Sequence, residues 1–158
     1  MHAVNVKAAI TAGLIAGLIF MMLEMALVAT VGGGSPWAPP RMIGAIVMGE
    51  GVLPPPAPFE LGVFLVAMAI HFVLAVVLGL VFGFIADKAN WGLGACAIAG
   101  LVFGLIVYFV NFYGMTAIFP WFAMARNGIS IFAHAMFGLV LGYMYRKLDP
   151  HREVVRDV

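Results

Sequence analysis

Four polar side chains lie inside long apolar stretches of this sequence, where they could do chemistry: Glu24, His71, Asn111 and His134. Two neutral imidazoles from different helices can hold a haem iron axially or bind a transition metal. A buried glutamate beside a histidine can instead carry protons, because burial and pairing change how readily each group binds one. A third interpretation is that these side chains only hydrogen-bond to one another and fix the packing of helices.

The apolar stretches that carry these residues are long enough to cross a bilayer. The chain has 158 residues, 65% hydrophobic and 9% charged, whereas about a quarter of a soluble domain is charged. Runs near the required length of about 20 residues cover 8–30, 61–86, 92–113 and 128–145. They do not alternate polar and apolar residues as barrel strands do. The sequence therefore predicts an all-α polytopic protein with one membrane domain, 1–158.

The four polar side chains should lie at similar depths. At a rise of about 1.5 Å per residue, all of them fall in the outer half of their spans. Glu24 and Asn111 lie on the glycine-rich faces of their helices, and His71 and His134 flank such faces. We expect these four side chains to line one cavity, with the two histidines as candidate metal ligands. Thioethers within reach by sequence are those of Met21, Met25, Met68 and Met136.

The links between the spans indicate the orientation. A long Gly- and Pro-rich link covers 31–60, a tight one runs from Asp87 to Trp91, and a third runs from Gly114 to Asn127. Basic residues favour the cytoplasmic side of a bacterial membrane protein. One side carries Lys7, Lys88, Arg146, Lys147, Arg152 and Arg156, and the other Arg41 and Arg126. Both termini, including a polar tail 147–158, should therefore be cytoplasmic.

The two outer arginines each follow a Pro-Trp pair, Pro36-Trp37 before Arg41 and Pro120-Trp121 before Arg126. We interpret Arg41, Arg126 and the two tryptophans as an outer-side cap over the cavity. The arginines could equally contact lipid headgroups or cap helices, and Arg41 could pair with Glu50 or Glu60.

The order of these residues indicates an internal repeat. Gly13, Gly17 and Glu24 of the first span match Gly100, Gly104 and Asn111 of the third. His71 and Gly79 match His134 and Gly142, and the Pro-Trp pairs match each other. The sequence thus predicts two tandem helical hairpins, repeat one 8–86 and repeat two 92–146, related by an axis along the membrane normal.

Every span also contains a G-x-x-x-G pair, which places two glycines on one helix face and lets helix backbones approach closely in lipid. We predict helix packing at Gly13, Gly17, Gly79, Gly83, Gly100, Gly104, Gly138 and Gly142.

A Gly-rich first span is followed by S-P-W-A-P-P-R-M (Ser35 to Met42) and later by F-P-W-F-A-x-A-R-N (Phe119 to Asn127). Over most of the chain, this pattern resembles a group of small bacterial four-helix inner-membrane proteins. The resemblance implies a bacterial inner-membrane location and carries no activity.

Several functions find no support in the sequence. No P-loop, Rossmann fingerprint, H-E-x-x-H or G-x-S-x-G motif is present, so we do not expect an enzyme. No basic stripe indicates nucleic acid, and the single Cys96 excludes an intrachain disulfide. Our leading hypothesis is a protein that binds a haem, metal ion or small ligand in its outer half. We expect the lipid bilayer to be its surroundings. The protein could act alone, as a homo-oligomer or as an accessory subunit of a larger membrane complex. The alternatives are a proton-coupled transporter or channel that uses Glu24, and a structural or assembly subunit.

Overall fold

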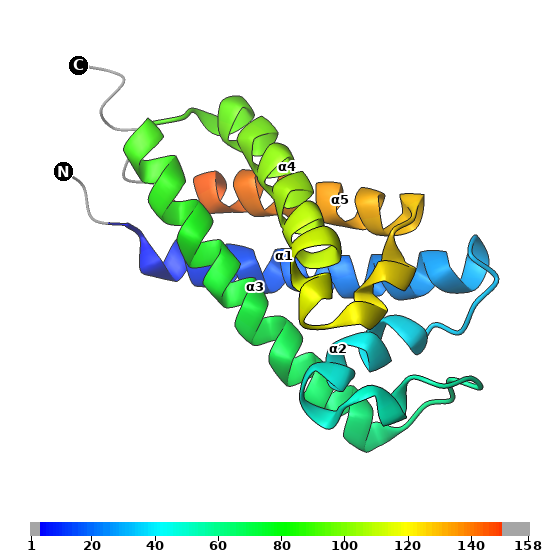
Figure 1. The fold of residues 1–158 in the computed structure, drawn as a ribbon. Helices are drawn as coiled ribbons and strands as arrows, with labels where there is room; N and C mark the ends of the chain where they lie inside the picture. Colours follow the sequence, from blue (N-terminus) through cyan, green and yellow to red (C-terminus); the bar gives the residue numbers. More distant parts are fainter. Residues whose placement is uncertain (1–3, 150–158) are drawn as a thin grey trace, which may run out of the picture.

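A computed structural model describes residues 4–149, and it is helical with no strand in that range. The predicted tail 147–158 falls mostly outside the described residues, as do Arg152 and Arg156. The long helices are α1 (Val6–Thr30), α3 (Leu61–Ala89), α4 (Leu93–Phe109) and α5 (Gly128–Leu148) (Figure 1). The outer links contain α2 (Ala38–Met48), the 3-10 turns η1 (Glu50–Val52), η3 (Met115–Ala117) and η4 (Pro120–Ala125), and a short π-helix, η2 (Val110–Gly114).

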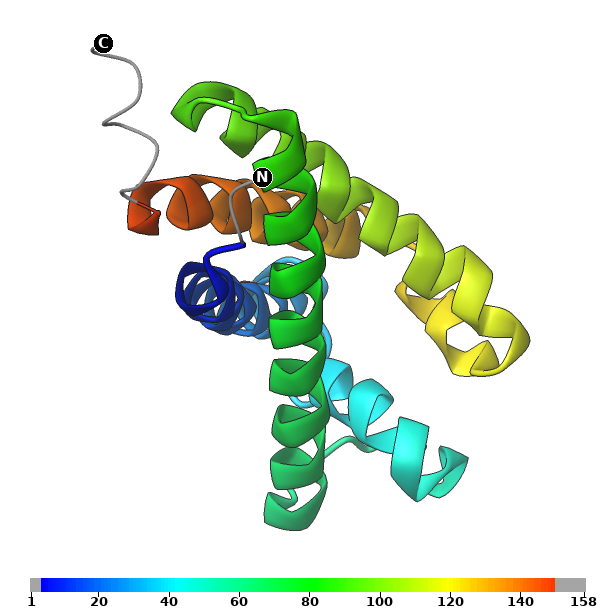
Figure 2. The same ribbon diagram turned by 90° about the vertical axis from the view of Figure 1, so that its left-hand side faces the viewer.

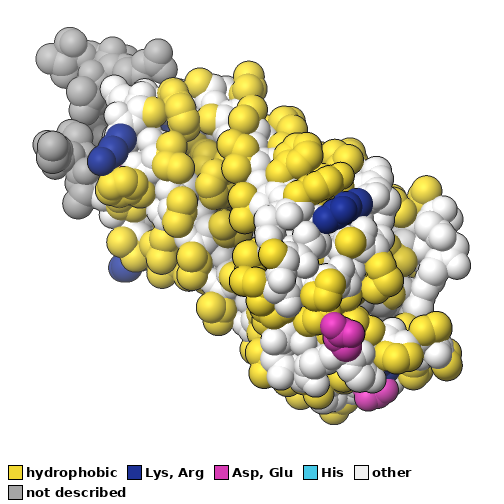
Figure 3. Space-filling view, in the orientation of Figure 1, with side chains coloured by type: hydrophobic (Ala, Val, Ile, Leu, Met, Phe, Trp, Pro, Cys, Tyr) yellow, Lys and Arg dark blue, Asp and Glu magenta, His cyan; other side chains and the backbone are white. Residues whose placement is uncertain are grey.

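The prediction of four spans is confirmed, since four helices are long and apolar enough to cross a membrane. Large apolar side chains are exposed along all four, which is the pattern expected where lipid is the solvent. Figure 3 shows hydrophobic side chains over most of one face, while acidic side chains gather at the end away from the chain termini. The chain is therefore a membrane protein.

Helices α1 and α5 form the centre of the molecule. Helix α1 packs along both α3 and α5, and α4 packs mainly on α5. Helices α3 and α4 leave their short connecting turn in different directions (Figures 1 and 2). Near that turn the rings of Phe82 and Phe103 still meet, with centroids 5.4 Å apart. Side chains of α1 and α5 thus have neighbours on two sides, which favours these helices as the place for buried polar groups.

Glycine allows the closest helix approaches. In the α1–α3 pair, a Cβ atom built on Gly13 would lie 2.5 Å from the carbonyl oxygen of Ala75. In the α4–α5 pair, one built on Gly138 would lie 2.0 Å from the carbonyl oxygen of Gly100. Both distances are too short for a real side chain, so these backbones touch only because no Cβ is present. Similar contacts under 3 Å occur at Gly17, Gly79, Gly100, Gly104 and Gly142, and Gly83 meets the ring of Tyr145 at 3.0 Å.

The ends of α1 and α5 meet opposite the outer links. The Asn5 side chain caps α1 by accepting a hydrogen bond from the Ala8 amide at 3.1 Å. The same side chain donates to Asp149 Oδ1 at 3.1 Å, and Asp149 also pairs with Arg146 at 3.6 Å. These contacts hold the first and last helices together and place both described ends on one side of the molecule.

Candidate functional site

Glu24 is a buried carboxylate on the central helix pair. Its side chain shares the buried stripe of α1 with Gly17 and Met21, and the residue is only 6% exposed. Oε1 accepts a hydrogen bond of 2.7 Å from the Ser130 hydroxyl of α5. Oε2 is also buried and has no hydrogen-bond partner among residues 4–149. One carboxyl oxygen is therefore held by the protein, while the other is left with its bonding capacity unused.

The first turn of α5 contacts the Glu24 carboxyl group through Ser130. Asn127 is the N-cap, and its side chain accepts a hydrogen bond from the Ser130 amide at 3.0 Å. Ser130 itself is fully buried and turns its hydroxyl toward Glu24. The positive end of a helix dipole lies in its first turn and favours a nearby negative charge. The carboxyl group of Glu24 thus lies beside the positive end of the α5 dipole.

His134 lies one turn further along α5 and is 4% exposed. Its Nδ1 donates to the Ser130 carbonyl oxygen at 2.8 Å, which leaves Nε2 as the acceptor nitrogen. Asn111 Nδ2 faces that Nε2 at 3.5 Å. The carbonyl of Ser130 thus fixes the imidazole, while its hydroxyl holds Glu24. Because a carbonyl cannot pass on a proton, Ser130 aligns the two titratable groups without relaying protons between them.

His71 is attached to α1 by a different bond. Its Nε2 donates to the carbonyl oxygen of Gly17 at 2.8 Å, and the residue is 8% exposed. A Cβ atom on residue 17 would lie 2.8 Å from the Cβ of Ala75, so glycine is required for this approach. His71 thereby holds α3 against α1, about two helical turns from Glu24.

Phe20 connects the two histidines. Its ring stacks on His71 with centroids 5.6 Å apart and meets His134 edge-on at 4.7 Å. Tyr108 and Phe112 of the α4 side also meet the His134 ring edge-on, at 5.6 and 5.3 Å. Aromatic rings prefer such edge-to-face contacts. Three aromatic rings therefore surround His134, and one of them, Phe20, lies against both His134 and His71.

The structure brings together three of the four predicted site residues, Glu24, His134 and Asn111, by way of Ser130. The fourth, His71, reaches them only through Phe20. Within residues 4–149, no three His, Cys, Asp or Glu side chains are grouped so that they could hold a metal ion. The contacts form a polar cluster in which Glu24 and His134 both bond to Ser130, with aromatic rings around His134.

No family model, curated protein or solved structure matches this chain.

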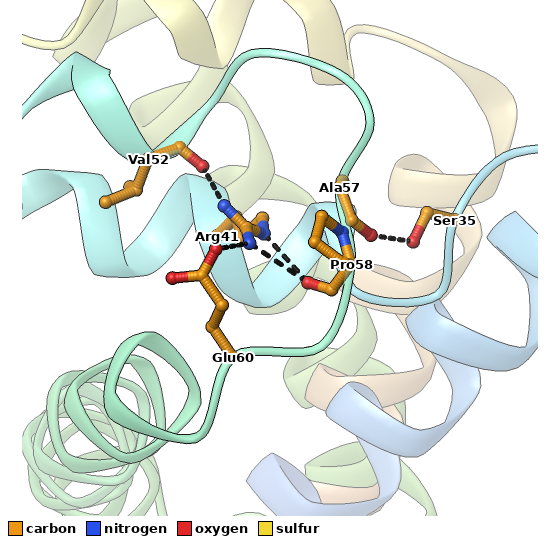
Figure 4. A network of polar contacts seen from close by, with 6 residues as sticks. All are labelled: Ser35, Arg41, Val52, Ala57, Pro58 and Glu60. Atoms are coloured by element: carbon orange, nitrogen blue, oxygen red, sulfur yellow. Dashed lines mark hydrogen bonds and ion pairs between the residues drawn. The ribbon is translucent and has the colours of Figure 1, made fainter.

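Arg41 holds the first outer link in shape. Its guanidinium donates to the carbonyl oxygen of Val52 at 2.6 Å, to that of Pro58 at 3.0 and 3.1 Å, and to the carboxylate of Glu60 (Figure 4). Nearby, the Ser35 hydroxyl donates to the carbonyl oxygen of Ala57 at 2.6 Å. Trp37 packs against Phe59, with ring centroids 4.7 Å apart. The described contacts of Arg41 are thus within its own link, and of the two predicted carboxylate partners it pairs with Glu60.

The second outer link is tied to the first and to α4. Trp121 Nε1 donates to the carbonyl oxygen of Met42 at 3.0 Å, which joins η4 to α2. Arg126 donates through Nε to the carbonyl oxygen of Phe112 at 2.6 Å. Trp121 therefore connects the second link to α2. Arg126 connects it to η2, where Phe112 lies against His134.

Sequence reasoning missed Ser130, Phe20 and η2. A signal for Ser130 was present, because Asn127 and Ser130 precede an apolar run in a capping pattern and Ser130 lies four residues before His134. Residues four apart share one helix face. Phe20 carried no such signal, since a phenylalanine in an apolar span resembles any lipid-facing residue.

Proposed function

We propose that this protein is a small proton-carrying membrane protein in which Glu24 takes up and releases the proton. An ionisable residue inside a membrane helix is costly and usually marks a function. The carboxyl group of Glu24 lies on α1 and is bonded to Ser130 of α5. A change in its protonation therefore acts directly on the contact between these two helices. His134 is a second titratable group, which bonds to the same residue, Ser130, as Glu24 does.

One observation carries the proposal: Glu24 Oε2 is buried with no hydrogen-bond partner among the described residues, while Oε1 is bound by Ser130. An unused acceptor oxygen in a buried place costs about 1–3 kcal/mol. If Glu24 had only a structural role, a hydrogen-bond donor placed next to Oε2 would make the protein more stable. A proton on Oε2 removes the negative charge, and release restores a carboxylate that Ser130 and the first turn of α5 stabilise.

Proton flux into proteoliposomes tests this function. A potassium gradient with valinomycin provides the driving potential, and a pH-sensitive dye inside the vesicles reports protons. Wild-type protein should acidify the vesicle interior, and Glu24→Gln should abolish this. Glu50→Gln is the matched control, because Glu50 is an exposed carboxylate in η1. Equal flux from wild type and Glu24→Gln would contradict the proposal.

Binding of a haem or transition metal by His71 and His134 stays a prediction. It is supported by the presence of one ring nitrogen on each histidine that is not bonded to a backbone carbonyl. An absorption spectrum and elemental analysis of purified protein test it, with a Soret band or bound metal that is lost in His71→Ala/His134→Ala as the supporting result.

We infer further that the two hairpins are a tandem repeat. In support, Gly13 meets the carbonyl of Ala75 as Gly100 meets that of Gly138, at matched positions. Likewise Gly79 meets the carbonyl of Ala9 as Gly142 meets that of Cys96. We place both termini in the cytoplasm of a bacterial inner membrane on the charge pattern and the resemblance given above.

A further inference from the structure

The side chain of Arg126 binds the segment that follows α4, in η2 and η3, at three places. Nε donates to the carbonyl oxygen of Phe112 at 2.6 Å, and NH2 donates to the Thr116 hydroxyl at 3.1 Å. The guanidinium carbon lies 4.3 Å from the ring centroid of Tyr113. A planar guanidinium with several fixed donors is suited to such a multiple contact. One exposed side chain thus holds most of the segment 112–116.

The segment that Arg126 holds includes most of η2, where α4 turns from α-helix into π-helix over Val110–Gly114. Single π-turns are rare and are often found at functional sites. This one carries Asn111 and Phe112, the two residues of η2 that contact His134. The conformation of η2 therefore decides whether the amide of Asn111 and the ring of Phe112 cover the imidazole.

The covered imidazole and Glu24 are bonded to the same residue, Ser130. His134 Nδ1 is bonded to the Ser130 carbonyl, and the Ser130 hydroxyl is bonded to Glu24. Arg126 precedes Asn127, which caps α5 and holds the Ser130 amide. The second outer link therefore contacts the site twice, through η2 and through the first turn of α5.

We propose that Arg126 is a positioning residue that holds η2 closed over His134 and so limits the access of outer water to Glu24. This inference rests on the proposed function in treating Glu24 as the proton-binding group, but the geometry can be tested without any flux. The other outer arginine, Arg41, offers a matched comparison, because its bonds go to Val52, Pro58 and Glu60 of its own link.

The test compares how fast Glu24 reacts with a water-soluble carbodiimide and an amine in the detergent-purified full chain. Peptide mass spectrometry gives the rate at Glu24 relative to the exposed Glu50. In Arg126→Gln this ratio should rise by roughly tenfold, the effect of losing one charge-assisted hydrogen bond. Arg126→Lys keeps the charge and should give a smaller rise, and Arg41→Gln should leave the ratio unchanged.

Two results would overturn the inference: an unchanged ratio in Arg126→Gln, or an equal rise in Arg41→Gln. Amide hydrogen exchange along α3 checks that each variant stays folded. If Arg126→Gln loses protection there, Arg126→Lys becomes the test, and an unchanged ratio in that variant counts against the inference. Because labelling does not require proton flux, a raised ratio supports the inference even where the flux experiment fails.

Discussion

Ser130 donates a hydrogen bond of 2.7 Å to Glu24 across 106 positions of the sequence. The bond joins the last turns of α1 to the first turn of α5, and it is buried at both ends. It links a membrane carboxyl group to the turn of α5 that Asn127 caps. Any movement between the two helices therefore changes the surroundings of Glu24.

Replacing Ser130 with Ala should impair proton flux strongly. Both carboxyl oxygens of Glu24 would then be without a donor, at a cost of about 1–3 kcal/mol for the ionised form. Vesicle acidification measures the effect. Ser35→Ala is the control, because the Ser35 hydroxyl donates to a carbonyl oxygen in the first outer link. Undiminished flux in Ser130→Ala would show that this bond has no part in proton binding.

The two histidines should differ in importance. His71→Gln keeps a donor at the place of Nε2, so the bond to the Gly17 carbonyl can persist and most of the flux should remain. His134→Asn keeps the donor toward Ser130 but removes the nitrogen that faces Asn111, and it should reduce flux. A shared metal site would instead make both variants equally inactive, so this pair of measurements separates the two hypotheses.

Gly138→Ala should destabilise the α4–α5 pair. Its Cβ would lie 2.0 Å from the carbonyl oxygen of Gly100, so the helices must separate. Forcing atoms into a tightly packed contact costs about 1–3 kcal/mol. Gly62→Ala is the control, since nothing lies within 4 Å of the added atom, and it should change stability by at most about 0.5 kcal/mol. Thermal unfolding in detergent measures both, and equal midpoints would contradict the packing described.

Single cysteines should show the first long link outside the cell and the α3–α4 turn inside it. In a Cys96→Ala background, Gly51→Cys in η1 should react with a membrane-impermeant maleimide added to whole cells. Ala89→Cys, at the end of α3, should react only after the cells are opened. Both native residues are exposed, so access to the reagent depends on the side of the membrane. The reverse pattern would place the termini outside.

The spans could be predicted from sequence because lipid demands long apolar helices with every backbone bond satisfied internally. Predicted and observed boundaries differ by a few residues, as for 61–86 against Leu61–Ala89. The inward direction of Glu24 followed from the glycine face it shares. The third span departs most, since it continues beyond α4 as the π-helix η2, where the Phe112 carbonyl accepts a hydrogen bond from Arg126.

The site was only partly predictable for a similar reason. Polar residues are easily recognised within an apolar stretch of sequence. Glu24, His71, Asn111 and His134 were found in that way. Their pairing depends on how α1 and α5 cross, which composition does not contain. Ser130 resembled an ordinary helix-start residue, and the role of Phe20 between two imidazoles appears only once three helices are placed together.

The most direct test of proton binding at Glu24 is an infrared pH titration of the purified protein in lipid. A protonated buried carboxyl group gives a C=O stretching band that ionisation removes. We predict one such pH-dependent band that is present in wild type and in Glu50→Gln and absent from Glu24→Gln. A titrating band that persists unchanged in Glu24→Gln, or no titrating buried carboxyl in the wild type, would contradict the account.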